Sequence, residues 1–139
     1  MKSSKKPNPP ISDFMTTIPV RLEETESLQT ALHLMQRYDI RHLPVTRGGA
    51  LAGVVSESGL RVLIGVMSQV DVVEQPVKIM VRDSPYTTSP DTPLKDVVAE
   101  MLRRRVSSVV VMKDEQIFGI FTITDALKLI QSAYDDDSE

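Results

Sequence analysis

The sequence contains an internal repeat that covers most of its length. At a constant offset of 66 positions, as from Leu28 to Leu94, similar residues pair without a gap. Further pairs are Pro19 with Pro85, Met35 with Met101, Ile40 with Val106, Val45 with Val111, Gly53 with Gly119, Val54 with Ile120, Ser56 with Thr122 and Leu63 with Leu129. A unit of this size cannot bury its apolar face alone, so a neighbouring unit must cover it. We therefore expect two copies of about 55 residues within the 139-residue chain.

Each copy predicts the element order β-α-β-β-α. Apolar residues recur at helical spacing from Leu28 and from Leu94, and the second of these helices should end near Arg105. Thr92 followed by Pro93 is typical of a helix start, with the hydroxyl as cap and proline in the first helical position. The other expected elements are leading strands near residues 20 and 86, hairpin strands at 43–46, 51–56, 108–112 and 117–122, and final helices at 57–67 and 124–134.

The pattern predicts an α+β fold in which the two repeats pack sheet to sheet about a pseudo-two-fold axis. We expect a leading helix or turn from Ile11 to Met15. The expected divisions of the chain are a flexible tail at 1–10, the first repeat at 11–67, a linker at 68–75, the second repeat at 76–134 and an acidic tail at 135–139.

Composition excludes several classes of protein. The net charge of -3 gives nucleic acid no general attraction, and the absence of cysteine excludes disulfides and thiol nucleophiles. His33 and His42 are too few for an all-histidine metal site, and no nucleophile and base can be arranged around them. The apolar stretches are far shorter than the roughly 20 residues of a membrane-spanning helix. We expect a cytoplasmic protein with neither enzyme activity nor a membrane or nucleic-acid partner.

The junction after the last strand of the second repeat predicts an anion and sugar site. Thr122 can donate to phosphate oxygens beside the positive end of the next helix, and the carboxylate of Asp125 can accept from two ribose hydroxyls. Gly119 would allow another chain or a ligand to approach closely. The alternative is local: Thr124 caps the helix and Asp125 suits its first turn.

Arg41 and His42 form a second candidate, because both precede a buried strand and both could donate to an anion. The alternative is that this pair is only a solvated strand entrance. The three arginines at 103–105 close a helix, and we expect them to complement its negative end rather than to bind nucleic acid.

These segments resemble the CBS domain, the family named from cystathionine β-synthase. The first repeat carries Arg-His-Leu-Pro-Val at 41–45 and Gly-Val-Val-Ser at 53–56. The second carries Ser-Pro-Asp-Thr-Pro-Leu at 89–94 and Gly-Ile-Phe-Thr-Ile-Thr-Asp at 119–125, and the likeness covers about residues 11–132. Pairs of such domains, called Bateman modules, typically bind AMP, ADP, ATP or S-adenosylmethionine and regulate another protein. The resemblance implies this function here, with the nucleotide as regulatory ligand and no required cofactor.

The resemblance also implies roles for individual residues. Thr122 would meet phosphate and Asp125 ribose, within the motif that holds Gly119 and Ile120. Arg41 and His42 would reach phosphate across the pair. The residues flanking adenine would be Tyr86, Thr87, Thr88, Val106, Ser107 and Ser108.

The first repeat departs from the family pattern, because Gly59 stands where the ribose-binding aspartate is expected. Losing a charged acceptor for a buried hydroxyl pair costs about 1.5–3 kcal/mol, so we expect one dominant nucleotide site, in the second repeat. We also expect a stand-alone module that forms a homodimer through the apolar helical segments 60–67 and 126–130 and signals to a separate, unidentified partner. The alternative is a structural or dimerisation module with vestigial clefts.

Overall fold

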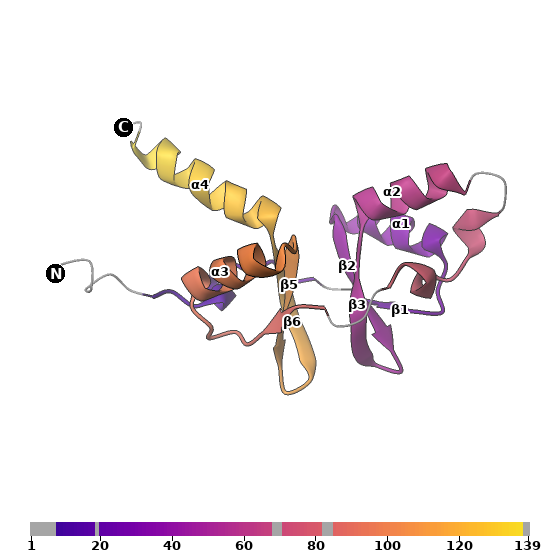
Figure 1. Ribbon diagram of the computed structural model, residues 1–139, viewed down its shortest axis with the longest axis horizontal. Helices are drawn as coiled ribbons and strands as arrows, with labels where there is room; N and C mark the ends of the chain where they lie inside the picture. The colour runs from indigo at the N-terminus through magenta and orange to yellow at the C-terminus, as the bar shows by residue number, and fades with distance from the viewer. Residues whose placement is uncertain (1–7, 19, 68–70, 82–84, 138–139) are drawn as a thin grey trace. The chain divides into compact units, whose positions relative to one another are not determined.

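The computed structural model describes residues 8–18, 20–67, 71–81 and 85–137. Within this part of the chain, four α-helices and two three-stranded sheets form an α+β fold, which confirms the expected class (Figure 1). The chain divides into two compact units. We call Ile18–Pro85 the repeat-one unit, and the described residues up to Thr17 together with those from Tyr86 onward the repeat-two unit.

The repeat-one unit has the predicted order of elements. They are β1 (Leu22–Glu23), α1 (Leu28–Tyr38), β2 (His42–Arg47), β3 (Ala50–Ser56) and α2 (Glu57–Val66). β1 runs parallel to β2, and β2 and β3 form an antiparallel hairpin. α1 begins where the Ser27 hydroxyl accepts from the Thr30 N–H and ends at Asp39, which takes the left-handed conformation.

The repeat-two unit repeats this plan at the same offset. Its elements are β4 (Thr87–Thr88), α3 (Leu94–Arg104), β5 (Ser108–Lys113), β6 (Gln116–Thr122) and α4 (Ile123–Asp137). The strand register of the hairpin shifts at the same place in both units, between Val45 and Thr46 in one and between Val111 and Met112 in the other. The duplication seen in the sequence is therefore a duplication of local structure.

Two details of the second repeat differ from the sequence prediction. Pro93 is the N-cap of α3 and not its first residue, and the Thr92 hydroxyl pairs with Thr88 and Ser89 and not with the helix. α4 continues to Asp137, so the segment expected to be an acidic tail begins as helix.

The segment before each repeat packs on the body of the other repeat. Ile11–Asp13 forms the 3-10 helix η2, as expected for a leading helix or turn, and Val77–Met80 forms η4. Ile11 N–H donates to Thr92 O over 2.8 Å, and Val77 N–H donates to Glu26 O over 2.7 Å. These two hydrogen bonds are equivalent at the repeat offset, and η3 (Val72–Glu74) precedes the second of them. Each compact unit therefore contains the leading segment of the other repeat.

Each unit has its own apolar core. In the repeat-one unit Val55 and Leu60 are buried, whereas the same two positions in the repeat-two unit are Phe121 and Ala126. The larger strand residue thus accompanies the smaller helix residue. In Figure 1, α4 leans away from α3 at its far end, whereas α1 and α2 lie side by side.

Candidate functional site

One edge of the repeat-two sheet gathers most of the predicted site residues. The start of β5 meets the end of β6, where Ser108 and Thr122 are register partners and Ile123 N–H donates to Ser107 O over 3.1 Å. The start of β4 lies at the same edge, because Val110 N–H donates to Tyr86 O over 3.0 Å. Backbone pairing therefore brings together segments that the sequence separates by about 35 residues.

Thr122 and Asp125 form a reciprocal cap at the start of α4. The Thr122 N–H donates to Asp125 Oδ2 over 2.9 Å, and the Asp125 N–H donates to Thr122 Oγ1 over 3.3 Å. This is the capping-box arrangement, in which two otherwise unsatisfied donors are paired at once. The sequence left two alternatives for this junction, an anion and sugar site or a local helix cap, and Asp125 belongs to both. The side chain that caps the helix is Thr122 and not Thr124.

The leading segment completes the surroundings of Asp125. Thr16 exchanges two backbone hydrogen bonds with Ile120, of 2.8 and 2.9 Å, and its hydroxyl donates to Asp125 Oδ1 over 3.2 Å. A Cβ on Gly119 would lie 2.8 Å from both Met15 Sδ and Thr16 O. Gly119 therefore permits the close approach of another segment of the same chain.

Thr16 is the residue that sequence reasoning missed. It lies 109 positions from Asp125 and belongs to no motif. The signal that could have found it was Gly119, because a glycine within a strand often marks the close approach of a second backbone.

Tyr86 is a core residue in this unit. The residue is 9% exposed, and the Arg104 guanidinium lies 4.6 Å from the ring centroid. Burial raises the pKa of the Tyr86 hydroxyl, and the charge of Glu100 adds to that effect. Thr87 and Ser107 are exposed and Thr88 is half-buried, with its hydroxyl donating to Thr92. Of the residues expected to flank adenine, Tyr86 thus has the least accessible side chain.

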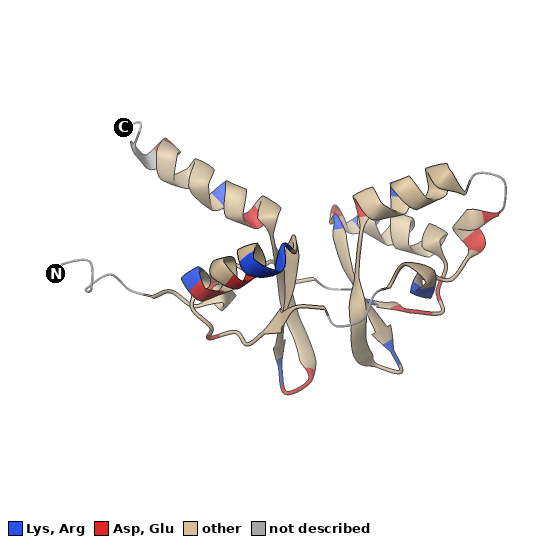
Figure 2. Ribbon diagram, viewed as in Figure 1, with Lys and Arg blue, Asp and Glu red and all other residues tan. Residues whose placement is uncertain are grey.

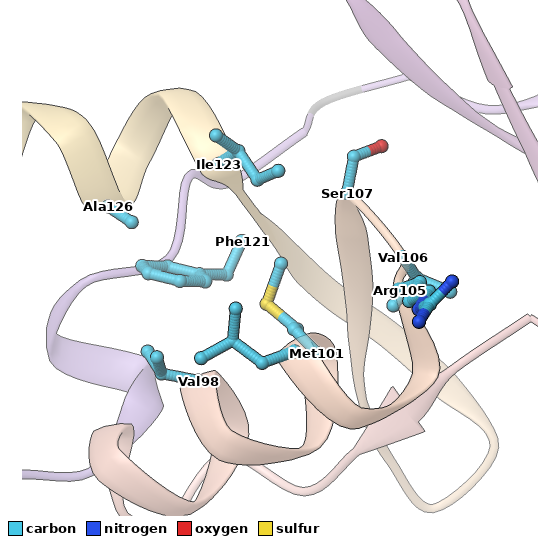
Figure 3. A pocket seen from close by; sticks show the side chains of 9 residues that line it. Val98, Met101, Arg105, Val106, Ser107, Phe121, Ile123 and Ala126 are labelled. Carbon is cyan, nitrogen blue, oxygen red and sulfur yellow. The ribbon is translucent and has the colours of Figure 1, made fainter.

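Val106 and Ser107 also line a groove between α3 and α4, on the helical side of the unit. It measures about 490 Å³ and is lined mainly by apolar side chains, with Arg105 and Ser107 at its rim (Figure 3). Figure 3 shows Phe121, Met101 and Val98 together on its floor. The groove is thus distinct from the hydrogen-bonded cluster around Asp125.

The position that corresponds to Thr122 and Asp125 is, in the repeat-one unit, a hollow. It measures about 820 Å³ and is bordered by the hydroxyl residues Ser56 and Ser58, by Gly59 and by apolar side chains of α2 and residues 79–81. Ser56 still caps its helix, since its Oγ accepts from Gly59 N–H over 3.1 Å. The carboxylate half of the cap is missing, as the sequence predicts from Gly59.

Arg41 and His42 belong to the repeat-one unit. The guanidinium of Arg41 forms an ion pair with Glu57 at 3.1 Å, and Arg61 holds the other oxygen of the same carboxylate. His42 begins β2 as the register partner of Ser56. The structure therefore gives Arg41 a partner within its own unit, and the Arg41 side chain is 75% exposed.

No helix in the described part of the chain is long and apolar enough to cross a membrane. No group of three histidine, cysteine, aspartate or glutamate side chains there is placed to hold a metal ion.

Comparison with known proteins gives a family match over both repeats. The model described as "CBS domain" matches residues 11–66 and 73–132. The A-adding tRNA nucleotidyltransferase of Aquifex aeolicus (strain VF5) is 28% identical over 122 residues, which are 87% of this chain and 14% of that protein. The chain spans between 10% and 36% of the length of the three curated relatives that it matches.

Two solved structures illustrate the similarity of fold. The AcuB protein from Vibrio cholerae is 26% identical, with a TM-score of 0.75 over 93% of this chain and 95% of that one. The CBS domain pair of protein MJ0100 has a TM-score of 0.78 at 20% identity, over 91% and 99% of the two chains. That structure is a complex with 5′-methylthioadenosine and S-adenosyl-L-methionine.

Proposed function

Since the chain belongs to the CBS domain family, with one copy in each repeat, we propose that it is a regulatory module that binds an adenosine nucleotide. The ligand class is AMP, ADP, ATP or S-adenosylmethionine, and no further cofactor is needed. Binding would change the conformation of the module and be transmitted to a partner protein. We propose no catalytic step, and we expect the module to act as a homodimer.

The observation that carries this proposal is the oriented carboxylate of Asp125. Its Oδ2 accepts from Thr122 and its Oδ1 from Thr16, so both oxygens are fixed in direction. A carboxylate has about four lone-pair sites, of which the N–H and hydroxyl of Thr122 and the hydroxyl of Thr16 occupy three. A ribose diol would take the fourth site and the site that a threonine hydroxyl gives up when it rotates. Thr122 and the first turn of α4 supply hydroxyl and N–H donors of the kind that bind phosphate. The CBS pair of protein MJ0100, which binds two adenosine compounds, supports the same ligand class.

The asymmetry between the repeats supports one dominant site. Asp125 is replaced at the equivalent position by Gly59, which offers no acceptor to a ribose. The hollow beside Gly59 retains the hydroxyls of Ser56 and Ser58. We therefore propose tight binding at the repeat-two position and weak binding or none at the repeat-one position.

The test is a titration of the full chain with each of the four ligands, by calorimetry and by thermal unfolding. A ligand that binds only the folded state at 100 times its Kd stabilises it by about 2.7 kcal/mol. Asp125→Asn should weaken the binding of the preferred ligand by roughly 10- to 100-fold, because the neutral amide loses the charge-assisted bonds to ribose. Thr124→Ala, in the same turn of α4, is the matched control. Equal affinity of the Asp125→Asn variant and the unsubstituted chain would contradict the proposal.

A second candidate function rests on the same cap. Thr122 and Asp125 bond to each other, so a purely structural role accounts for both side chains. The chain would then be an interaction module with vestigial clefts, as Gly59 favours. In that case none of the four ligands would raise the unfolding temperature.

A further inference from the structure

The segment before the first repeat adds one residue to the sheet of the repeat-two unit. Thr16 exchanges two backbone hydrogen bonds with Ile120 at the outer edge of β6, over 2.8 and 2.9 Å. Ile120 is the register partner of Val110 on β5, and Val110 pairs with Thr87 on β4. Thr16, Ile120, Val110 and Thr87 therefore form one row across the sheet.

This row lies close to both points at which the chain passes between its two units. The chain leaves the repeat-two unit after Thr17 and re-enters it at Tyr86, so Thr16 and Thr87 are each within two residues of a crossing. Thr16 also belongs to the surroundings of the proposed ligand site, because its hydroxyl donates to Oδ1 of Asp125 over 3.2 Å. A single side chain thus connects the ligand carboxylate with the first crossing.

The two oxygens of the Asp125 carboxylate differ in accessibility. Oδ2 accepts from Thr122, a residue that is only 7% exposed. Oδ1 accepts from Thr16, which is exposed. A ribose hydroxyl that arrives from solvent therefore meets Oδ1 first, at the place that the Thr16 hydroxyl occupies.

The hydrogen bond from Thr16 to Asp125 is easy to replace. Its O···O distance of 3.2 Å exceeds the about 2.5–2.7 Å of a strong bond between a hydroxyl and a carboxylate. Figure 2 marks an acidic residue in the first turn of α4, which is Asp125. No lysine or arginine of the described residues forms an ion pair with it. A ribose hydroxyl can thus exchange for another neutral hydroxyl, at a shorter distance, without breaking an ion pair.

We propose that binding of the ribose displaces the Thr16 hydroxyl from Asp125 and thereby weakens the attachment of the leading segment beside its crossing into the repeat-one unit. This inference rests on the proposed nucleotide site and adds the route by which that site reports its occupancy. The two backbone hydrogen bonds to Ile120 remain, so the segment is loosened and not released. Because coupling between two sites is reciprocal, loss of the Thr16 hydroxyl should strengthen ligand binding as much as the ligand weakens the attachment of the segment.

The first test measures affinity by calorimetry on the full chain, with AMP, ADP, ATP and S-adenosylmethionine in turn. Thr16→Val keeps the shape of the side chain and removes the hydroxyl, so it should bind the ligand roughly 3- to 10-fold more tightly, which corresponds to one hydrogen bond. Thr16→Ser keeps a hydroxyl and should restore the affinity of the unsubstituted chain. Thr17→Val, at the neighbouring exposed threonine, is the matched control and should leave the affinity unchanged.

Hydrogen exchange at the Ile120 N–H measures the other direction of the coupling, because this group donates to Thr16 O. Saturating ligand should accelerate that exchange by roughly 3- to 10-fold in the unsubstituted chain, and Thr16→Val should do so without ligand. The Val110 N–H lies in the same row and donates to Tyr86 O. It is the internal reference, and its exchange should not be accelerated.

Two results would overturn the proposal while leaving the nucleotide site in place. Equal or weaker binding by Thr16→Val would mean that the hydroxyl has no effect or holds Asp125 in position for the ligand. Slower exchange at Ile120 when ligand binds would mean that the ligand fastens the leading segment. Failure of all four ligands to bind the unsubstituted chain is a different result, which would overturn the nucleotide site itself and this inference with it.

Discussion

The hydroxyl of Thr16 donates to Oδ1 of Asp125 over 3.2 Å, so the segment before the first repeat contacts the carboxylate on which the proposed ligand site depends. The other oxygen of that carboxylate accepts from the Thr122 N–H. Asp125 therefore joins three parts of the repeat-two unit: the leading segment, the end of β6 and the first turn of α4. Different substitutions of Asp125 can separate its contribution to the stability of the fold from its proposed contribution to ligand binding.

Asp125→Ala should lower the free energy of unfolding by about 1 kcal/mol in the absence of nucleotide, because it removes one half of the capping box. Asp125→Asn should cost less, since the amide oxygen can still accept from the Thr122 N–H. Urea unfolding of both variants, with Thr124→Ala alongside, measures these differences. An alanine variant as stable as the unsubstituted chain would show that the cap contributes nothing.

Gly59→Asp should create in repeat one the cap that repeat two already has. An added Cβ at Gly59 would lie 3.1 Å from Ser56 Oγ and 3.2 Å from Met80 Cε, and both atoms are ends of side chains that can move slightly. Replacing a helical glycine and adding a first-turn carboxylate should together stabilise the fold by roughly 1 kcal/mol.

The same variant should also bind a second nucleotide, which calorimetry would report as a change in stoichiometry from one to two. Gly59→Ala is the control, because it gains helix propensity without gaining a carboxylate. A second site in both variants, or in neither, would contradict the role assigned to the aspartate.

The regular elements were predictable from the sequence because their signals are local. The helical spacing from Leu28 and the apolar strand from Val109 to Val111 each predict their element without knowledge of the rest of the chain. The repeat then doubles the evidence, since each helix and hairpin strand occurs twice at one offset. The missing carboxylate at Gly59 was likewise visible in the sequence alone.

The remaining features depend on contacts between distant segments. Thr16 reaches Asp125 only because the segment before the first repeat packs on the second repeat. No local sequence pattern predicts that packing. Tyr86 is buried in the apolar core of the repeat-two unit, together with Ile11 from the leading segment. The helix cap expected at Thr92 was wrong because its hydroxyl pairs with Thr88 and Ser89 in the preceding loop.

The ion pairs of Glu100 with Arg103 and Arg104 should make the stability of the fold depend on pH at acidic pH. Hydrogen bonds from Arg103 and Arg104 lower the pKa of Glu100 from 4.5 to about 2. A carboxylate whose pKa is lower in the folded state stabilises the fold above its unfolded pKa, and that contribution disappears as the pH falls towards the folded value. The unfolding temperature should therefore decline between about pH 4.5 and pH 2.

Glu100→Gln should flatten this part of the pH profile, because the amide does not titrate. Glu74→Gln, at an exposed glutamate of η3, controls for the loss of one negative charge. About 1 M salt should reduce the effect in the unsubstituted chain, since the cluster is at the surface. An unchanged pH profile in the Glu100→Gln variant would show that the cluster does not contribute to stability.

Gly119→Ala should destabilise the repeat-two unit by detaching its leading segment. The added methyl would lie 2.8 Å from Thr16 O, and this carbonyl cannot retreat because Thr16 is held to Ile120 by two backbone hydrogen bonds. Overpacking of this kind costs about 1–3 kcal/mol. Gly65→Ala in α2 meets no atom within 4 Å and should instead stabilise the fold by up to about 1 kcal/mol, because alanine is the better helix former. Urea unfolding measures both changes, and faster hydrogen exchange at Thr16 and Ile120 would locate the first. Equal stability of the two variants would mean that the leading segment contributes nothing to the unit that carries Asp125.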